Sequence, residues 1–145
     1  MGPKANPFSG RGQIRRRWQA PTVEMYSAQV LDHFERPRNA GELDSPSAVV
    51  EVTNPVCGDV LKLAARVEGG CVTAVRFKIQ GCVTAVACGS LLTEWMQDQP
   101  LAALEKITYQ RISAALGDLP PATLHGAQLA QDALHALLTH LPKTG

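Results

Sequence analysis

The stretch VLKLAARVEGGCVTAVRFKIQ, residues 60–80, decides the fold of this chain. Apolar and polar residues alternate on both sides of a Gly69-Gly70 pair. The alternating apolar positions are Leu61, Leu63, Ala65 and Val67 in the first run, and Val75, Phe77 and Ile79 in the second. Such alternation is typical of strands with one buried face, and paired glycines supply the positive φ of a tight turn. The stretch therefore predicts an antiparallel hairpin with one polar face and one core face.

The flanking segments predict one further strand and several helices. AVVEVT, residues 48–53, predicts a strand, and residues 26–41 predict a helix that has an apolar stripe at Val30, Leu31 and Phe34 and is stopped by Pro37. Downstream, we expect a helix in residues 83–98, one or two shorter helices in residues 101–116, and a last helix from about Ala127 to His140. Strands followed by helices predict an α+β fold, with a small antiparallel sheet of about three strands and helices packed on one face.

Composition predicts one ordinary domain. The 145 residues are 45% hydrophobic and 19% charged. A net charge of +1 provides no field that would attract nucleic acid or an anionic membrane, and no apolar run approaches the roughly 20 residues of a membrane span. We predict a domain over residues 25–141 and a disordered basic tail over residues 1–24. No apolar stretch follows the arginines at 15–17, so an export signal is disfavoured and a cytoplasmic location is expected.

The four cysteines favour metal or sulfur chemistry over disulfides, because the expected compartment is reducing. Cys57 lies in the NPVCGD loop, residues 54–59, between the first two strands, and Cys82 follows the third strand where a helix begins. In an antiparallel meander these two junctions can meet at one end of the sheet. A helix N-terminus favours the thiolate form of Cys82, and Asp59 offers an oxygen ligand beside Cys57. The loop is thus predicted to be half of a metal site.

The other thiols and histidines have structural interpretations. Cys88 follows Cys82 by six residues, a net rotation of roughly 240° around a helix, so the two should not share a face. We therefore predict that Cys88 is a buried packing residue. Cys71 begins the third strand at the opposite end of the sheet. The remaining histidines are predicted to be surface or packing residues; these are His33, His135 and His140.

Four motifs in order carry a family resemblance. They are YSAQVLDHFERPRNAG (26–41), NPVCGD (54–59), FKIQGCVTAVACGSLLTEW (77–95) and LPPATLHGAQLAQDAL (119–134). Through them the chain resembles the IscU/NifU N-terminal family of iron–sulfur cluster assembly scaffolds from Tyr26 to His140. The resemblance implies a SufE/NifU-like fold and one exposed site that holds a nascent 2Fe–2S cluster or a zinc ion. The positions that match the family's ligands are Cys57, Asp59, Cys82 and His125.

Two departures from the family pattern fall in one short segment. The family's third cysteine directly follows the histidine, whereas this chain has Gly126 there. The resemblance ties that thiol to receiving persulfide sulfur, so its loss puts cluster building by the usual route in doubt. The family's chaperone-recognition sequence LPPVK appears as LPPAT, residues 119–123, which puts release assisted by an Hsp70-type chaperone in doubt.

Three functions remain open. The leading one is a non-enzymatic scaffold or carrier that binds a labile 2Fe–2S cluster and transfers it to apo-proteins. The second is a zinc-bound sulfur acceptor that partners a cysteine desulfurase through Cys57 or Cys82. The third is a degenerate adaptor or regulator of the assembly complex. The resemblance implies a cysteine desulfurase, an Hsp70-type chaperone and apo iron–sulfur proteins as partners, and a homodimer that shares a cluster stays open.

Overall fold

A computed structural model describes residues 26–141 of the chain, so the predicted tail at 1–24 lies outside the described residues. The elements follow one another as α2 (Ala28–Glu35), β1 (Ala48–Thr53), β2 (Val60–Glu68), β3 (Cys71–Gln80), α3 (Val83–Met96), α4 (Leu101–Leu104), α5 (Tyr109–Ala115), a 3-10 turn (Pro121–Thr123) and α6 (Leu124–His140). None of the helices in this part of the chain is long and apolar enough to cross a membrane.

The three strands form one antiparallel sheet in the order β1-β2-β3, as the sequence predicted. Val50 pairs with Leu63, and Leu63 pairs with Phe77, so one buried row crosses all three strands. Lys62 pairs with Lys78 in the next row, whose side chains point to the opposite face because the side-chain period of a strand is two. Gly69 and Gly70 both have positive φ, 61° and 79°, which confirms the predicted glycine turn.

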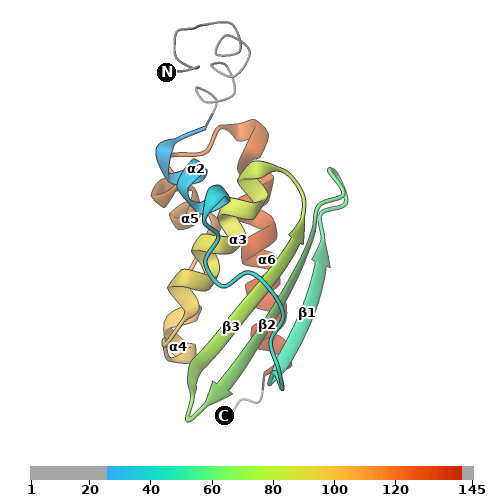
Figure 1. Cartoon of the computed structure of the whole chain (residues 1–145), viewed down its shortest axis with the longest axis vertical. Coiled ribbons are helices and arrows are strands. Elements are labelled where there is room, and N and C mark those ends of the chain that lie inside the picture. Colours follow the sequence, from blue (N-terminus) through green and yellow to red (C-terminus); the bar gives the residue numbers. More distant parts are fainter. Residues whose placement is uncertain (1–25, 142–145) are drawn as a thin grey trace, which may run out of the picture.

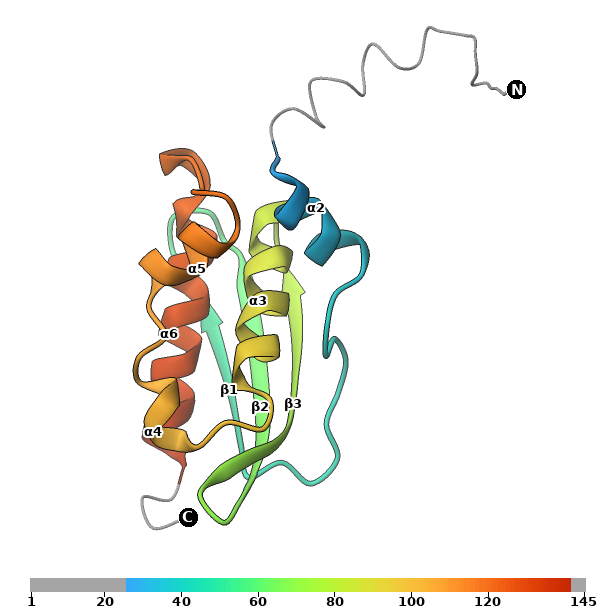
Figure 2. The ribbon, with the colours of Figure 1, turned by 90° about the vertical axis from the view of Figure 1, so that its left-hand side faces the viewer.

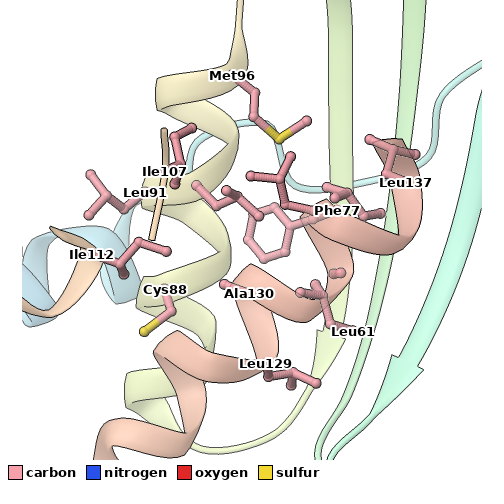
Figure 3. Packing of buried hydrophobic residues seen from close by; sticks show 14 of the residues in the cluster. Leu61, Phe77, Cys88, Leu91, Met96, Ile107, Ile112, Leu129, Ala130 and Leu137 are labelled. Carbon is pink, nitrogen blue, oxygen red and sulfur yellow. The ribbon is translucent and has the colours of Figure 1, made fainter. Parts of the chain in front are cut away.

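Helices α3 and α6 cover one face of this sheet (Figures 1 and 2). Helix α3 packs on β3, and α6 packs on β1 and β2. Figure 3 shows the ring of Phe77 in the core beside these helices. The ring packs over Gly89 of α3, where a Cβ would lie only 2.9 Å from two ring carbons. The predicted α+β class, with helices on one face of a small sheet, is confirmed.

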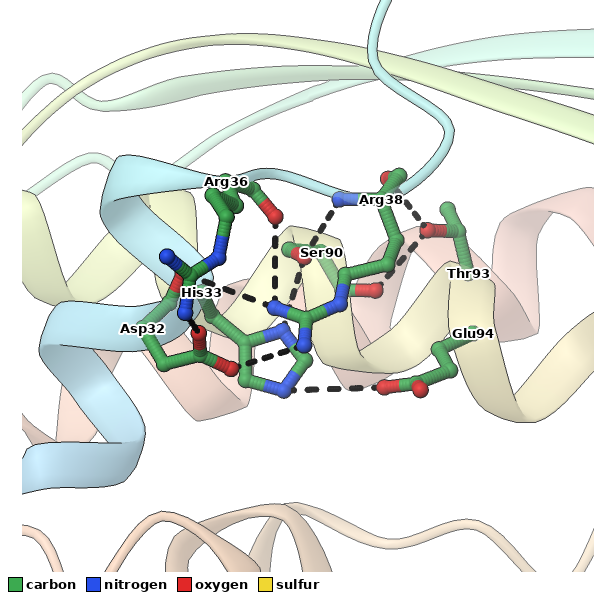
Figure 4. A network of polar contacts seen from close by, with 7 residues as sticks. All are labelled: Asp32, His33, Arg36, Arg38, Ser90, Thr93 and Glu94. Atoms are coloured by element: carbon green, nitrogen blue, oxygen red, sulfur yellow. Dashed lines mark hydrogen bonds and ion pairs between the residues drawn. The ribbon is translucent and has the colours of Figure 1, made fainter.

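Helix α2 is fixed to α3 by a polar network (Figure 4). His33 is 7% exposed, and its Nδ1 is hydrogen-bonded to Oγ of the buried Ser90 at 2.8 Å. The backbone N–H of Arg38 donates to the same oxygen at 2.9 Å, and its guanidinium donates to Asp32 at 2.7 Å. Burial, and secondly the Arg38 charge, lower the pKa of His33 below its ordinary value. His33 is therefore a packing residue, which is one of the two roles, surface or packing, that the sequence predicted for it.

Two details of the predicted helices are wrong. Helix α6 begins at Leu124 rather than near Ala127, because a 3-10 turn runs directly into it. His125 and Gly126 consequently lie inside the first helical turn. In α2, Phe34 is 39% exposed although the apolar stripe predicted it to face inward, and His33 takes the buried position instead.

Candidate metal centre

The NPVCGD loop is held closed by its own first residue. The side-chain oxygen of Asn54 accepts from the backbone N–H groups of Val56 and Cys57, at 2.8 and 3.3 Å. Its backbone N–H donates to the Asp59 carbonyl, and the Gly58 N–H donates to the Asn54 carbonyl, both at 2.8 Å. The bend leaves Cys57 exposed and turns Asp59 inward, where only 8% of the residue is exposed.

Cys82 is the N-cap of α3. Its Sγ accepts from the backbone N–H of Ala85 at 3.4 Å, which satisfies one of the amide groups left free at a helix start. The predicted position of this thiol at a helix N-terminus is therefore confirmed. The last pair of the β2–β3 ladder, Val60 with Gln80, sets Asp59 and Cys82 at the same end of the sheet.

His125 reaches this end of the sheet from the first turn of α6. Its Nε2 lies 3.5 Å from Oδ2 of Asp59 and 3.8 Å from Sγ of Cys82. The Cys82 Sγ lies 3.9 Å from the same carboxylate oxygen. Ligand atoms of Cys57, Asp59 and His125 all lie within 4.8 Å of one another. The four residues that the sequence singled out thus gather at this end of the sheet as two groups of three donors, which share Asp59 and His125 and contain one thiol each.

The spacing and charge of this cluster suit a cation. Tetrahedral metal sites with bonds of about 2.0–2.3 Å place neighbouring donor atoms about 3.3–3.8 Å apart. The distances among Asp59, Cys82 and His125 lie close to this range. Burial of a carboxylate is costly without an opposite charge, and within residues 26–141 the only ionic partner within 4.0 Å of Asp59 is His125. A bound metal ion would supply the missing positive charge.

A side chain at position 126 would fit only tightly between α6 and α3. The residue is buried, and a Cβ there would lie 3.1 Å from Cα and 3.3 Å from N of Ala85. It would also lie 3.4 Å from Sγ of Cys88. The glycine therefore lets α6 approach the backbone of α3 closely. The LPPAT segment, residues 119–123, precedes it and is exposed from Pro120 to Ala122.

The remaining two cysteines are not among the proposed ligands. Cys88 is 0% exposed, and burial, with the nearby Cys82 thiol as a smaller cause, raises the pKa of its own thiol. The predicted packing role of Cys88 is confirmed. Cys71 pairs with Glu68 beside the hairpin turn, at the other end of the sheet, where the sequence predicted it.

Two residues at the site were missed by sequence reasoning. Asn54 shapes the loop, and the carboxylate of Asp59 occupies the space that a Cβ on Gly81 would need. Both stood inside the quoted motifs, NPVCGD and QGCV, yet nothing in their spacing set them apart from ordinary turn residues. The role of Asn54 is a local turn within its own loop, whereas that of Gly81 arises from its position opposite Asp59 across the sheet end.

A three-stranded sheet backed by helices on one face, with two thiols, a carboxylate and an imidazole at one end, defines a small α+β domain with a candidate metal centre. Residues 25–144 match the family described as "NifU-like N terminal domain". The chain belongs to this family.

Relatives across bacteria, archaea and eukaryotes carry related names. The chain is 37% identical over 122 residues to the iron–sulfur cluster assembly scaffold protein IscU 1 of Archaeoglobus fulgidus, covering 83% of this chain and 80% of the relative. It is 43% identical over 115 residues to the IscU scaffold protein of Azotobacter vinelandii, covering 77% and 89%. A Drosophila melanogaster relative, 39% identical over 132 residues and covering 88% and 84%, is named an iron–sulfur cluster assembly enzyme.

Solved structures support the fold. A crystal structure of a putative scaffold protein for the SUF system of Fervidobacterium islandicum superposes with a TM-score of 0.69. It is 18% identical to this chain and covers 81% of it and 98% of the other chain, so the likeness shows the fold alone.

Proposed function

We propose that this protein is an iron–sulfur cluster assembly scaffold or carrier that holds a labile 2Fe–2S cluster and transfers it to apo-proteins. The proposed ligands are Cys57, Asp59, Cys82 and His125. The observation that carries the proposal is their convergence from the NPVCGD loop, the α3 N-terminus and the first turn of α6. Membership of a family whose relatives are named as scaffolds supports the same role.

The ligand set suits a cargo that must leave. Thiolates bind iron and zinc strongly, whereas a carboxylate is a harder and weaker ligand for a cluster. Cys57 lies on an exposed loop, so one ligand is open to an incoming donor or acceptor. His125 is partly exposed, with 26% of its side chain accessible. These properties favour transfer over permanent electron carriage, and the protein itself performs no enzymatic step.

The proposed partners follow from the cargo. A scaffold needs a sulfur donor, here a cysteine desulfurase, and apo iron–sulfur proteins as acceptors. Cys57 and Cys82 are the exposed thiols at the site and are the proposed sulfur acceptors. An Hsp70-type chaperone would meet the exposed Pro120–Ala122 chain, which differs from the family sequence. We propose a cytoplasmic location. A homodimer that shares the cluster between two chains would supply the additional thiol that is absent at Gly126.

A second function, a zinc-bound sulfur acceptor, is favoured by the compactness of the cluster. The separations of 3.5–3.9 Å among Asp59, Cys82 and His125 suit one tetrahedral ion. A 2Fe–2S cluster has two irons, each needing about two protein ligands, so the four donors would have to separate into two pairs. The exposed loop that carries Cys57 is the part of the site that can move most easily to make this separation.

Anaerobic purification followed by metal and sulfide analysis tests both functions. The scaffold predicts about two irons and two sulfides per cluster. It also predicts loss of the cluster in Cys57→Ala and retention in the matched control Cys88→Ala, whose buried thiol is not a proposed ligand. Colourless protein with one zinc per chain supports the second function instead. Metal-free protein that still binds a desulfurase contradicts both and supports the adaptor role.

A further inference from the structure

Gly81, the residue before Cys82, has a backbone conformation that does not require glycine. Gly81 is absent from the residues of the described chain that have positive φ, so an L-residue fits its backbone conformation. It follows the last residue of β3, Gln80, which pairs with Val60 at the end of the β2–β3 ladder. Extending that antiparallel register by one residue places Gly81 opposite Asp59.

The carboxylate of Asp59 occupies the space that a side chain at position 81 would need. A Cβ on Gly81 would lie 2.8 Å from Cγ of Asp59, and 2.9 and 3.1 Å from its two oxygens. Separations under 3.0 Å are below ordinary van der Waals contact, so an alanine methyl and the carboxylate cannot both stay in place. Because Gly81 has no side chain, the carboxylate of Asp59 can occupy this space, which is called the seat below.

This seat aims the carboxylate into the cluster. Oδ2 of Asp59 lies 3.5 Å from Nε2 of His125 and 3.9 Å from Sγ of Cys82 while the residue is only 8% exposed. We propose that Gly81 is the positioning residue that holds Asp59 inward as a ligand and so fixes the oxygen donor of the site. The positioning of Asp59 by Gly81 does not depend on the proposed function. Only its expected effect on metal affinity rests on that function.

Gly81 differs in kind from the other tightly packed glycines. A Cβ on Gly126 would meet the backbone of Ala85, and one on Gly89 would meet the buried ring of Phe77. At Gly81 all three nearest atoms belong to the end of one side chain, which can rotate away from the site. Gly81→Ala should therefore leave the fold intact and displace the carboxylate.

Zinc affinity tests the consequence of the seat. We would titrate wild type, Gly81→Ala, Asp59→Ala and the double variant with Zn²⁺ against a competing chelator. Loss of a group that orients a metal ligand typically lowers affinity about 10–100-fold. We expect a loss of at least tenfold for Gly81→Ala, a similar loss for Asp59→Ala, and no further loss in the double variant. Wild-type affinity in Gly81→Ala, or multiplied losses in the double variant, would overturn the proposal.

Thermal unfolding of the metal-free proteins tests the seat itself. Gly81→Ala should change the Tm of wild type through two opposing effects, because the clash of the methyl lowers it and the release of a buried carboxylate from a metal-free site raises it. In the Asp59→Ala background the same substitution should not lower the Tm, because the space is empty and alanine restricts the unfolded chain. In Asp59→Asn, which keeps the shape without the charge, it should lower the Tm, because the clash remains and no buried charge is released. An equal change of Tm in all three backgrounds would overturn the proposal that Gly81 positions Asp59, even if the site binds metal. A wild-type protein that binds no metal would overturn the proposed function alone.

Discussion

Sγ of Cys82 lies 3.8 Å from Nε2 of His125, although 43 residues separate them along the chain. Cys82 caps α3 and His125 lies in the first turn of α6, so the contact joins the N-terminal ends of the two helices that cover the sheet (Figure 1). The positive ends of both helix dipoles thus point at the same end of the sheet, where the proposed metal ligands gather.

The two roles of Cys82 can be separated by substitution. Cys82→Ser keeps an oxygen that caps α3 but removes the thiolate, so we expect zinc or cluster binding to be lost while the metal-free Tm stays near that of wild type. Cys82→Ala removes the cap as well and should destabilise the metal-free protein by a further ~1 kcal/mol. Metal analysis and thermal unfolding measure the two effects. Equal stability of the two variants would contradict the capping role.

Exchanging the carboxylate for a thiolate should slow the release of a cluster. In Asp59→Cys the hard oxygen ligand is replaced by a soft thiolate, which binds iron more strongly. We expect the reconstituted variant to transfer its cluster to an apo-ferredoxin several-fold more slowly than wild type, measured by circular dichroism. Asp59→Asn, which keeps the shape and an oxygen, is the control. Transfer from Asp59→Cys at the wild-type rate would show that Asp59 does not limit release.

Restoring a third cysteine should cost stability. In an open helix, replacing glycine with alanine gains about 1 kcal/mol. A Cβ on Gly126, however, would press on the backbone of Ala85 at 3.1 Å, and overpacking of this kind costs about 1–3 kcal/mol. We therefore expect Gly126→Ala and Gly126→Cys to lower the free energy of unfolding by similar amounts in urea titrations. A gain of stability in both variants would mean that α3 and α6 can move apart without a cost in free energy.

The contact between α2 and α3 should weaken in mild acid. The pKa of His33 in the folded protein is lowered from its ordinary 6.5 by burial and then by Arg38, against the smaller opposing charges of Glu94 and Asp32. The unfolded chain therefore binds a proton first as the pH falls. The stability that His33 contributes is complete above pH 6.5 and is lost as the pH falls through the lowered folded pKa.

Urea titrations of wild type and His33→Asn between pH 5 and pH 8 measure this loss. The stability of wild type should fall more steeply on acidification than that of the variant, which has no imidazole to protonate. Parallel pH profiles would show that the network in Figure 4 does not depend on neutral His33.

The four thiols should differ in reactivity. Cys57 and Cys82 are exposed, whereas Cys88 is 0% exposed and burial raises its pKa. Alkylation of the native metal-free protein by iodoacetamide should label Cys57 and Cys82 first, and Cys88 only after unfolding. Peptide mass spectrometry identifies the sites. Zinc added beforehand should protect Cys57 and Cys82 but leave the partly exposed Cys71 unchanged, which makes Cys71 the internal control.

The four proposed donor residues were singled out by the family motifs in the sequence. The sequence by itself also determined the hairpin at residues 60–80 and the helix class of the later segments. These follow from local rules, because alternation, helical periodicity and glycine turns depend on residues close along the chain. The packing role of Cys88 was likewise readable from its angular offset from Cys82. The start of α6 was misplaced by three residues because a 3-10 turn continues into the helix without a sequence break.

Only the tertiary structure decided how the donors meet and what fills the space between them. The seat of Asp59 over Gly81 and the contact of Gly126 with Ala85 join segments that are far apart in sequence. Both depend on the distance between packed elements, which is set by the side chains that interdigitate across the whole core and by no local pattern. The sequence alone therefore shows that the family's third cysteine is missing, and the packing of α6 on α3 shows that a side chain in its place would press on the backbone of Ala85.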